Sequence, residues 1–149
     1  MTQHQAGWRF CQKCSNMTFS GGGPGVCLGG GDHEPQGFHF SLPFDRVESA
    51  VHERHFFFCS KCHSMFQNKD FGGGDLGTCA KGGQHDRTDS IEFVLSHDTP
   101  VTNGQDKWVV CVNCSVMFFG PAARQICPKN SLSHDPGSDF PDFNLPHTD

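Results

Sequence analysis

The sequence predicts an all-β fold built from three repeats of one hairpin-containing unit. Apolar and polar residues alternate with a period of two in the segments FHFSL and IEFVL, which is the pattern of a strand with one buried face. The chain has 18 glycines and 9 prolines among 149 residues, and they interrupt every candidate helix. The same order of cysteine, methionine, phenylalanine and histidine also occurs three times. We therefore expect strands and turns, with no long helix.

We expect residues 1–149 to form a single domain of three repeats, 7–47, 55–98 and 107–147. Each repeat begins with an apolar triplet before a C-x2-C motif, which predicts an entering strand. A methionine and a phenylalanine follow and predict a second strand. We then expect a glycine-rich turn, a short strand at the third cysteine, and a closing strand of alternating apolar residues. Residues 43–54 and 96–107 are the predicted linkers, the first with one or two helical turns at most.

Cysteine and histidine recur at nearly constant spacing in the three repeats. The third cysteine follows the C-x2-C pair after 12, 16 and 12 residues, and a histidine follows it after 5, 5 and 6 residues. Three thiolates and one imidazole are an accepted ligand set for tetrahedral structural zinc. We therefore predict three zinc ions, each closed by four protein ligands and hence not catalytic. The predicted ligands are Cys11, Cys14, Cys27 and His33; Cys59, Cys62, Cys79 and His85; and Cys111, Cys114, Cys127 and His134.

The run between the third cysteine and the histidine predicts a tight turn. It reads CLGGGDH in the first repeat and CAKGGQH in the second, and its glycines permit positive φ where the chain must reverse. The third repeat reads CPKNSLSH, with Pro128 and Asn130 in place of glycines and one additional residue. The third site is therefore expected to be the least regular of the three.

The net charge and the N-terminal segment indicate which partners and which cellular compartment to expect for this protein. The formal charge is −5, and three zinc ions on nine thiolates would make it about −8. The chain has no basic run, so nucleic acid is a disfavoured partner. The segment MTQHQAGW is not a signal peptide, and no apolar run is long enough to predict a membrane span. We expect reduced thiols and a cytoplasmic or non-classically secreted protein.

The pattern C-x2-C…C-x5-H resembles the zinc-ribbon and zinc-knuckle families, and its three copies make up most of the chain. The repeat length is similar to that of β-trefoils, which contain three repeats of four strands. The runs QAGW and QDKW resemble the Gln-x-x-Trp of ricin-type trefoil repeats. This second resemblance implies a pseudo-threefold, β-trefoil-like arrangement and lectin-like carbohydrate sites. Three separate zinc ribbons along the chain are the alternative architecture.

These observations lead to a non-enzymatic, zinc-containing recognition protein, with multivalent carbohydrate binding as the first hypothesis. Candidate contacts lie at matching places in the repeats: Asp32, Glu34, Gln84, Asp86, Asp135, Trp8 and Trp108. The alternative roles are support of the metal ligands for the acids and core packing for the tryptophans. A zinc-ribbon adaptor for protein or nucleic acid is the second hypothesis, on the basis of Lys13 and Lys61 inside the first two knuckles. No G-x-S-x-G, P-loop or H-E-x-x-H motif supports an enzyme.

Overall fold

The protein forms strands and no helix in the part of the chain that the computed structural model describes. The described residues are 3–21, 25, 27, 31–44, 46–68, 77–88, 90–121, 127, 134–135 and 142–148. Among them there is no helix with the length and hydropathy that crossing a bilayer requires. The strands are β1 Gln3–Cys11, β2 Met17–Phe19, β3 Pro35–Phe44, β4 His52–Phe58, β5 Met65–Gln67, β6 Phe93–His97, β7 Gly104–Val110, β8 Met117–Phe119 and β9 Phe143–Pro146. The predicted all-β class is confirmed.

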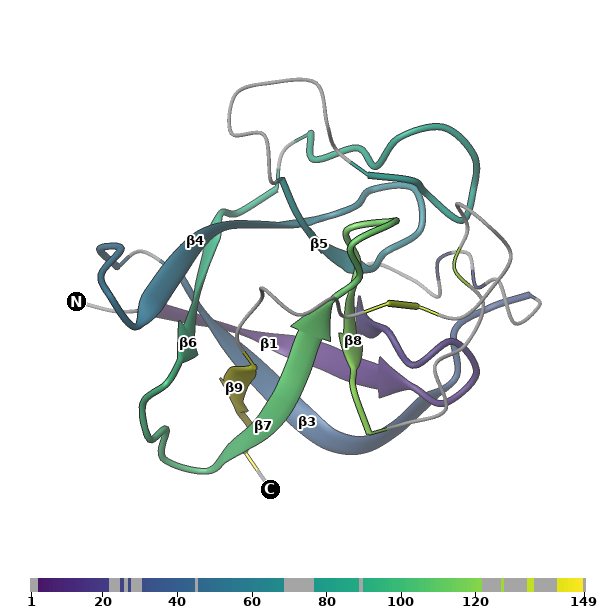
Figure 1. Ribbon diagram of the computed structural model, residues 1–149. Helices are drawn as coiled ribbons and strands as arrows, with labels where there is room; N and C mark the ends of the chain where they lie inside the picture. Colours follow the sequence, from purple (N-terminus) through teal and green to yellow (C-terminus); the bar gives the residue numbers. More distant parts are fainter. Residues whose placement is uncertain are drawn as a thin grey trace.

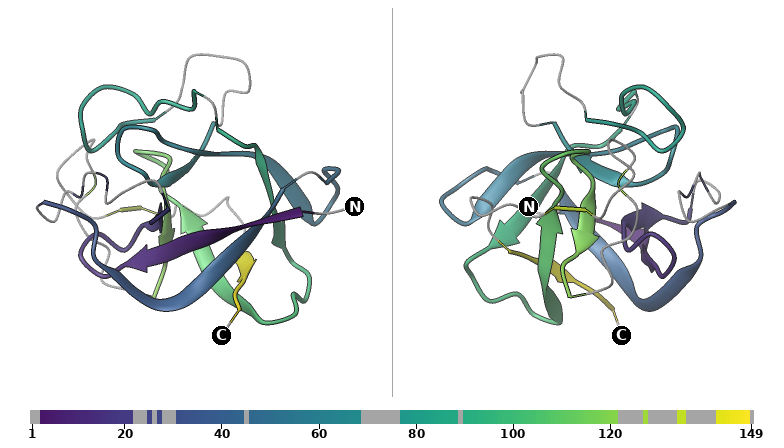
Figure 2. Two further views of the ribbon diagram at one scale, coloured as in Figure 1. Left: turned by 180° about the vertical axis from the view of Figure 1, so that it is seen from behind. Right: turned by 45° about the vertical axis from the view of Figure 1, so that its right-hand side comes forward.

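All nine of these strands belong to one sheet, which curves until it nearly closes on itself (Figure 1). The order along its main path is β2-β1-β3-β6-β9-β7-β8, with β4 attached to β5 and β6. Every pairing between these strands is antiparallel. The strands surround a common interior from each direction of view (Figure 2). This curvature brings segments from all three predicted repeats around one core.

Three hairpins with the same register carry the C-x2-C motifs. The pairs β1–β2, β4–β5 and β7–β8 match Trp8 with Phe19, Phe56 with Gln67, and Trp108 with Phe119. The predicted entering and second strands are therefore confirmed. The predicted short strand at the third cysteine is wrong in the first two repeats, because Cys27 and Cys79 each begin a tight turn instead, and the neighbours of Cys127 lie outside the described residues. The amide of Cys27 donates to Gly31 O at 3.0 Å, and the amide of Cys79 donates to Gly83 O at 2.8 Å.

The predicted linkers are shorter in the structure than in the sequence interpretation. Strand β3 extends to Phe44 and β4 begins at His52, so both ends of the segment 43–54 are strand. The described residues between them contain no helical turn, and Ser49 and His52 pair there by their backbones. Strand β6 likewise ends at His97 and β7 begins at Gly104. Pairing of neighbouring strands satisfies more backbone groups than one isolated helical turn would.

A single cluster of aromatic and aliphatic side chains from all three repeats forms the main core. Trp8 packs edge-on against Phe93 with ring centroids 5.4 Å apart, and Trp108 packs in the same way against Phe40 at 5.4 Å. Both tryptophans have 0% exposure. Their indole nitrogens donate to Gln5 Oε1 and Gln105 Oε1 at 3.0 and 3.1 Å. The prediction of Trp8 and Trp108 as ligand contacts is therefore wrong, because the sheet curves over these rings and removes them from solvent.

Candidate metal centres

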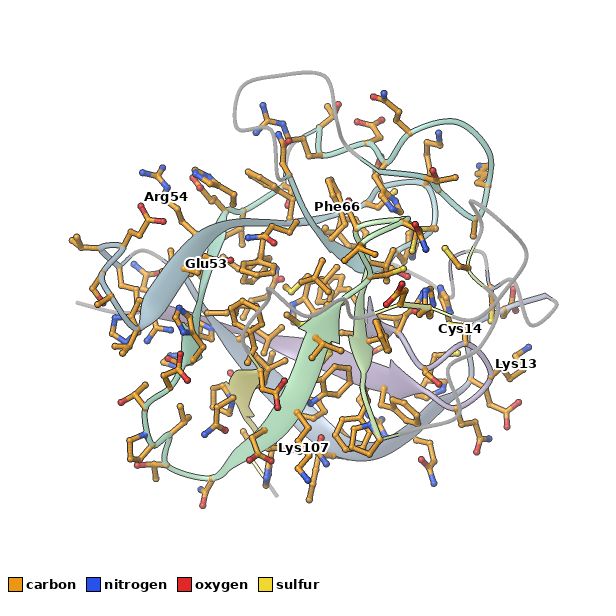
Figure 3. The ribbon with its side chains drawn as sticks, viewed as in Figure 1. Lys13, Cys14, Glu53, Arg54, Phe66 and Lys107 are labelled. Carbon is orange, nitrogen blue, oxygen red and sulfur yellow. The ribbon has the colours of Figure 1, made fainter. Side chains whose placement is uncertain are left out.

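Three groups of buried side chains bring together the twelve predicted metal ligands. Each contains three cysteines and one histidine, and their ligand atoms lie within 4.8 Å of one another. The nine cysteines are 0–4% exposed, and His33, His85 and His134 are 8%, 2% and 2% exposed. Figure 3 shows Cys14 on the knuckle that follows β1, at the right of the view. Cluster 1 is the group that contains His33, cluster 2 contains His85, and cluster 3 contains His134.

The distances within each cluster are those of a tetrahedron around zinc. The first and third cysteine sulfurs are 3.8 Å apart in all three clusters. The second cysteine sulfur lies 3.5, 3.6 and 3.4 Å from Nδ1 of the histidine. Zn–S bonds of about 2.3 Å and a Zn–N bond of about 2.05 Å at tetrahedral angles require about 3.8 Å and about 3.6 Å. A disulfide would need about 2.05 Å, so the clusters fit three structural zinc ions.

The knuckle between the first two cysteines has the same backbone in each repeat. The amide of the first cysteine donates to the carbonyl five residues later, at 3.0, 3.0 and 2.9 Å. The residue after the second cysteine adopts positive φ: Ser15 at 67°, His63 at 66° and Ser115 at 69°. This left-handed residue turns the chain so that both sulfurs face one point. None of the three is a glycine or an asparagine, so composition contained no signal for it.

The segment that contains the histidine also supports the cysteines through its backbone. The amides of Glu34, Asp86 and Asp135 donate to the first cysteine sulfur of their own repeat at 3.4, 3.4 and 3.5 Å. Such bonds stabilise the thiolate that binds metal. Glu34 and Asp135 are exposed, and Asp86 Oδ1 accepts from the amide and the hydroxyl of Thr88 at 2.9 and 2.6 Å. The acids thus assist the ligands by their amides, while a ligand-binding role of their carboxylates stays a prediction.

The remaining two predicted contacts lie at the same turns. Asp32 and Gln84 are exposed. The carbonyl of Gln84 accepts from Lys61 Nζ at 2.7 Å, and the carbonyl of Gly82 accepts from the same amine at 2.6 Å. Lys61 therefore folds back over the turn that closes cluster 2, and its charge is engaged within the protein.

The clusters have ionisation properties suited to a divalent cation. Hydrogen bonds from Cys14 and Cys27 hold the pKa of the Cys11 thiol far below its ordinary value. The hydrogen bond from Cys114 lowers the pKa of Cys111 to about 3. Burial opposes the charge on His33, yet its bonds to Cys11 and Cys27 raise its pKa to about 9. Binding of zinc must displace the proton on His33, so affinity falls as the pH is lowered.

Two of the histidines reach from one repeat to the next. His33 Nε2 lies 2.7 Å from Cys62 O, and His85 Nε2 lies 3.0 Å from Cys114 O. A carbonyl only accepts, so Nε2 carries the hydrogen and Nδ1 keeps its lone pair for the metal. The zinc ligands of one repeat are therefore oriented by the knuckle of the following repeat. Nothing in the spacing of the sequence predicted this contact.

Glycines two residues before the third cysteine make a second contact between repeats. Gly25 has φ +70°, and a Cβ built on it would lie 2.5 Å from Cys62 O. Gly77 has φ +79°, and its Cβ would lie 2.3 Å from Cys114 O. These are the carbonyls that also accept from His33 and His85. Alignment of the first two repeats shows both glycines, but only the structure shows what they approach.

A pair of glycine substitutions tests how tightly the repeats fit together. Gly31 has φ +65° with nothing within 4 Å of its position, whereas Gly77 faces a backbone carbonyl. Gly31→Ala is expected to cost about 1 kcal/mol for its left-handed backbone alone. Gly77→Ala is expected to lose at least about 1 kcal/mol more, because the added methyl overpacks the contact. Urea unfolding in zinc-containing buffer measures both, and equal losses would contradict the close approach.

Comparison of this chain with models of known protein families, with curated proteins and with solved structures finds no match. The clusters and the sheet are therefore interpreted from their own geometry.

Proposed function

We propose that this chain is a non-enzymatic recognition protein of the lectin type, in which three zinc ions serve only as structural cross-links. The closed ligand sets support this proposal. Each cluster offers four protein ligands, and all twelve are buried. A catalytic zinc keeps a position for water or substrate, and these tetrahedra contain none. Binding of a ligand must then occur elsewhere on the surface.

We further propose that the repeats are arranged about a pseudo-threefold axis, as in a β-trefoil. Three equivalent backbone hydrogen bonds support it. The amide of Phe19 donates to His63 O, that of Gln67 donates to Ser115 O, and that of Phe119 donates to Ser15 O, at 2.9, 3.0 and 3.0 Å. Each bond runs from the second strand of one repeat to the knuckle of the next, and the third bond returns to the first repeat. A linear row of separate ribbons would lack this return.

The observation that carries the binding proposal is an aromatic hollow of about 530 Å³ between the first and third repeats. The rings of Phe10, Phe38, Phe40 and Phe119 and the amides of Gln36 and Gln105 line it. Phe38 is 37% exposed and stacks on His147 with centroids 3.8 Å apart. The corresponding position in the second repeat, two residues before the buried phenylalanine, is Ile91. The second repeat therefore lacks the exposed phenylalanine ring of this hollow.

The lining of the hollow suits both the apolar C–H groups and the hydroxyl groups of a sugar. Its aromatic rings provide apolar contact for C–H groups, and the amides provide hydrogen bonds for hydroxyls. Gln105 Oε1 already accepts from Trp108 Nε1 at 3.1 Å, which orients the amide and directs its NH2 group to other acceptors. The proposal thus places the principal glycan contact at Phe38 and Gln105, within one junction.

A second hollow supports ligand binding less well. It lies around Arg46, Arg54 and Glu92, and Figure 3 shows Arg54 on the opposite side of the molecule from Cys14. Both of its arginines are already engaged with Glu92 or with the backbone. Arg54 pairs with Glu92 at 3.0 Å, and Arg46 donates to Val94 O at 2.6 Å. A ligand there would have to replace these bonds.

Phe38→Ala is expected to abolish glycan binding while the fold is retained, because it removes the exposed ring of the aromatic hollow. Ile91→Ala, at the matching position of the second repeat, is expected to bind as well as the unchanged protein. The measurement is a glycan array with zinc-loaded protein, followed by titration of the best sugar by isothermal calorimetry. Absence of binding to every glycan, or equal loss in both variants, would overturn the lectin proposal.

Two observations disfavour nucleic acid as the partner of a zinc-ribbon adaptor. Lys61, one of the two knuckle lysines, donates to the carbonyls of Gly82 and Gln84. With a formal charge of −5, the chain offers little to bind phosphates. A protein partner remains the alternative to a glycan, and binding of a protein at the same hollow would also be lost in Phe38→Ala.

A further inference from the structure

The three clusters have the same ligands but different surroundings. His33 Nε2 and His85 Nε2 each bond to a carbonyl of the next repeat, at 2.7 and 3.0 Å. His134 is equally buried, at 2% exposure, but its Nε2 has no hydrogen-bond partner within the described part of the chain. The corresponding acceptor would be Cys14 O, in the knuckle of the first repeat. Cluster 3 therefore lacks the bond that orients the histidine in the other two.

The sequence of the third repeat differs at the same contact. Gly25 and Gly77 let the chain approach the knuckle carbonyl of the next repeat. The third repeat has Gln125 at the matching position, and this residue lies outside the described residues. Glycine accommodates such an approach because it has no Cβ, and glutamine carries one. The interval from Cys127 to His134 is also one residue longer than in the other repeats. Both changes are specific to cluster 3.

Ring stacking does not compensate for the missing bond. His134 stacks on Phe118 with centroids 4.9 Å apart, and His85 stacks on Phe66 at 4.6 Å. Clusters 2 and 3 thus share the stack, and only cluster 2 also has the hydrogen bond. In cluster 1 the matching residue is Thr18 rather than a phenylalanine, but the bond from His33 is present. The bond distinguishes cluster 3 from both others.

We propose that cluster 3 is an exchangeable zinc site, whereas clusters 1 and 2 retain their zinc as permanent cross-links. An unsupported histidine binds metal with about 10–100-fold lower affinity than one whose second nitrogen is paired. When zinc passes to a competing chelator, its bonds to Cys111, Cys114, Cys127 and His134 break, and protons from water take the place of the ion among these ligands. The protein would then bind and release one zinc ion reversibly. This activity does not depend on the proposed glycan binding.

The experiment follows which thiols are freed first. Zinc-loaded protein is titrated with EDTA, native mass spectrometry counts the remaining metal ions, and brief N-ethylmaleimide pulses label exposed thiols for peptide mapping. When one zinc ion has left, Cys111, Cys114 and Cys127 are expected to be labelled about 10–100-fold faster than the other six. First labelling at cluster 1 or cluster 2, or labelling of all nine together, would overturn the proposal.

A matched pair of variants tests the cause. His85→Cys and His134→Cys each replace an imidazole ligand by a thiolate, but only the first removes a bond to the next repeat. His85→Cys is expected to release the zinc of cluster 2 at least about 10-fold faster. His134→Cys should leave release from cluster 3 unchanged or slower. If His85→Cys does not fold, His33→Cys makes the same comparison at cluster 1. Equal changes in the variants would show that the hydrogen bond does not set the order.

Discussion

Removal of all three zinc ions is expected to unfold the protein at neutral pH. Binding of structural zinc to zinc-finger peptides contributes about 10–16 kcal/mol of folding free energy, and a whole domain is stable by only about 5–15 kcal/mol. The metal-free clusters would also leave nine thiols and three imidazoles buried against one another. Excess chelator should therefore abolish the near-UV circular dichroism of Trp8 and Trp108, and added zinc should restore it.

Metal analysis of the purified protein should accompany this experiment and find three zinc ions per chain. Chelator saturated with zinc beforehand is the control and should leave the spectrum unchanged. A matched pair of variants localises the effect within one knuckle: Cys62→Ser removes a ligand, whereas Ser60→Ala changes an exposed neighbour. We expect only the first to unfold or to lose one zinc ion. A protein with an unchanged melting temperature after complete zinc removal would contradict a structural role.

Phe93→Ala is expected to have the largest effect outside the metal clusters. Phe93 has 0% exposure, packs against Trp8 at 5.4 Å and pairs through its backbone with Phe44 and Phe56. It therefore connects strands of the first and second repeats in the centre of the core. Truncation of a buried phenylalanine removes apolar contacts and leaves a cavity, at a loss of about 3–5 kcal/mol. Urea unfolding with saturating zinc measures this loss.

Phe38→Ala is the control, because Phe38 lies in the same sheet but is 37% exposed. Its loss of stability is expected to be about 1 kcal/mol or less. The comparison separates a general effect of removing a ring from an effect of the shared core. If Phe93→Ala were no more destabilising than Phe38→Ala, the three repeats would not depend on one core.

The metal ligands and the hairpins were predictable because each is a local property of one repeat. The C-x2-C spacing and the alternating strands involve residues that are close in the sequence, so a pattern repeated three times identified them. Prediction was wrong at Cys27 and Cys79, where a short turn replaces the expected strand. It was also wrong for Trp8 and Trp108, because a tryptophan near a strand end has the same local pattern whether the sheet exposes or covers it.

The all-β class, the twelve metal ligands and the irregular third interval could all be predicted from the order of the residues. The carbonyls that His33 and His85 reach, the burial of the rings and the place of the aromatic hollow follow from the folded arrangement. His33 meets Cys62 O, and Phe10 and Phe119 line the same hollow, through contacts between residues far apart in the chain. Such contacts depend on how the sheet curves and closes, and this curvature results from the pairings of all the strands together. Local sequence patterns therefore do not predict the curvature of the sheet.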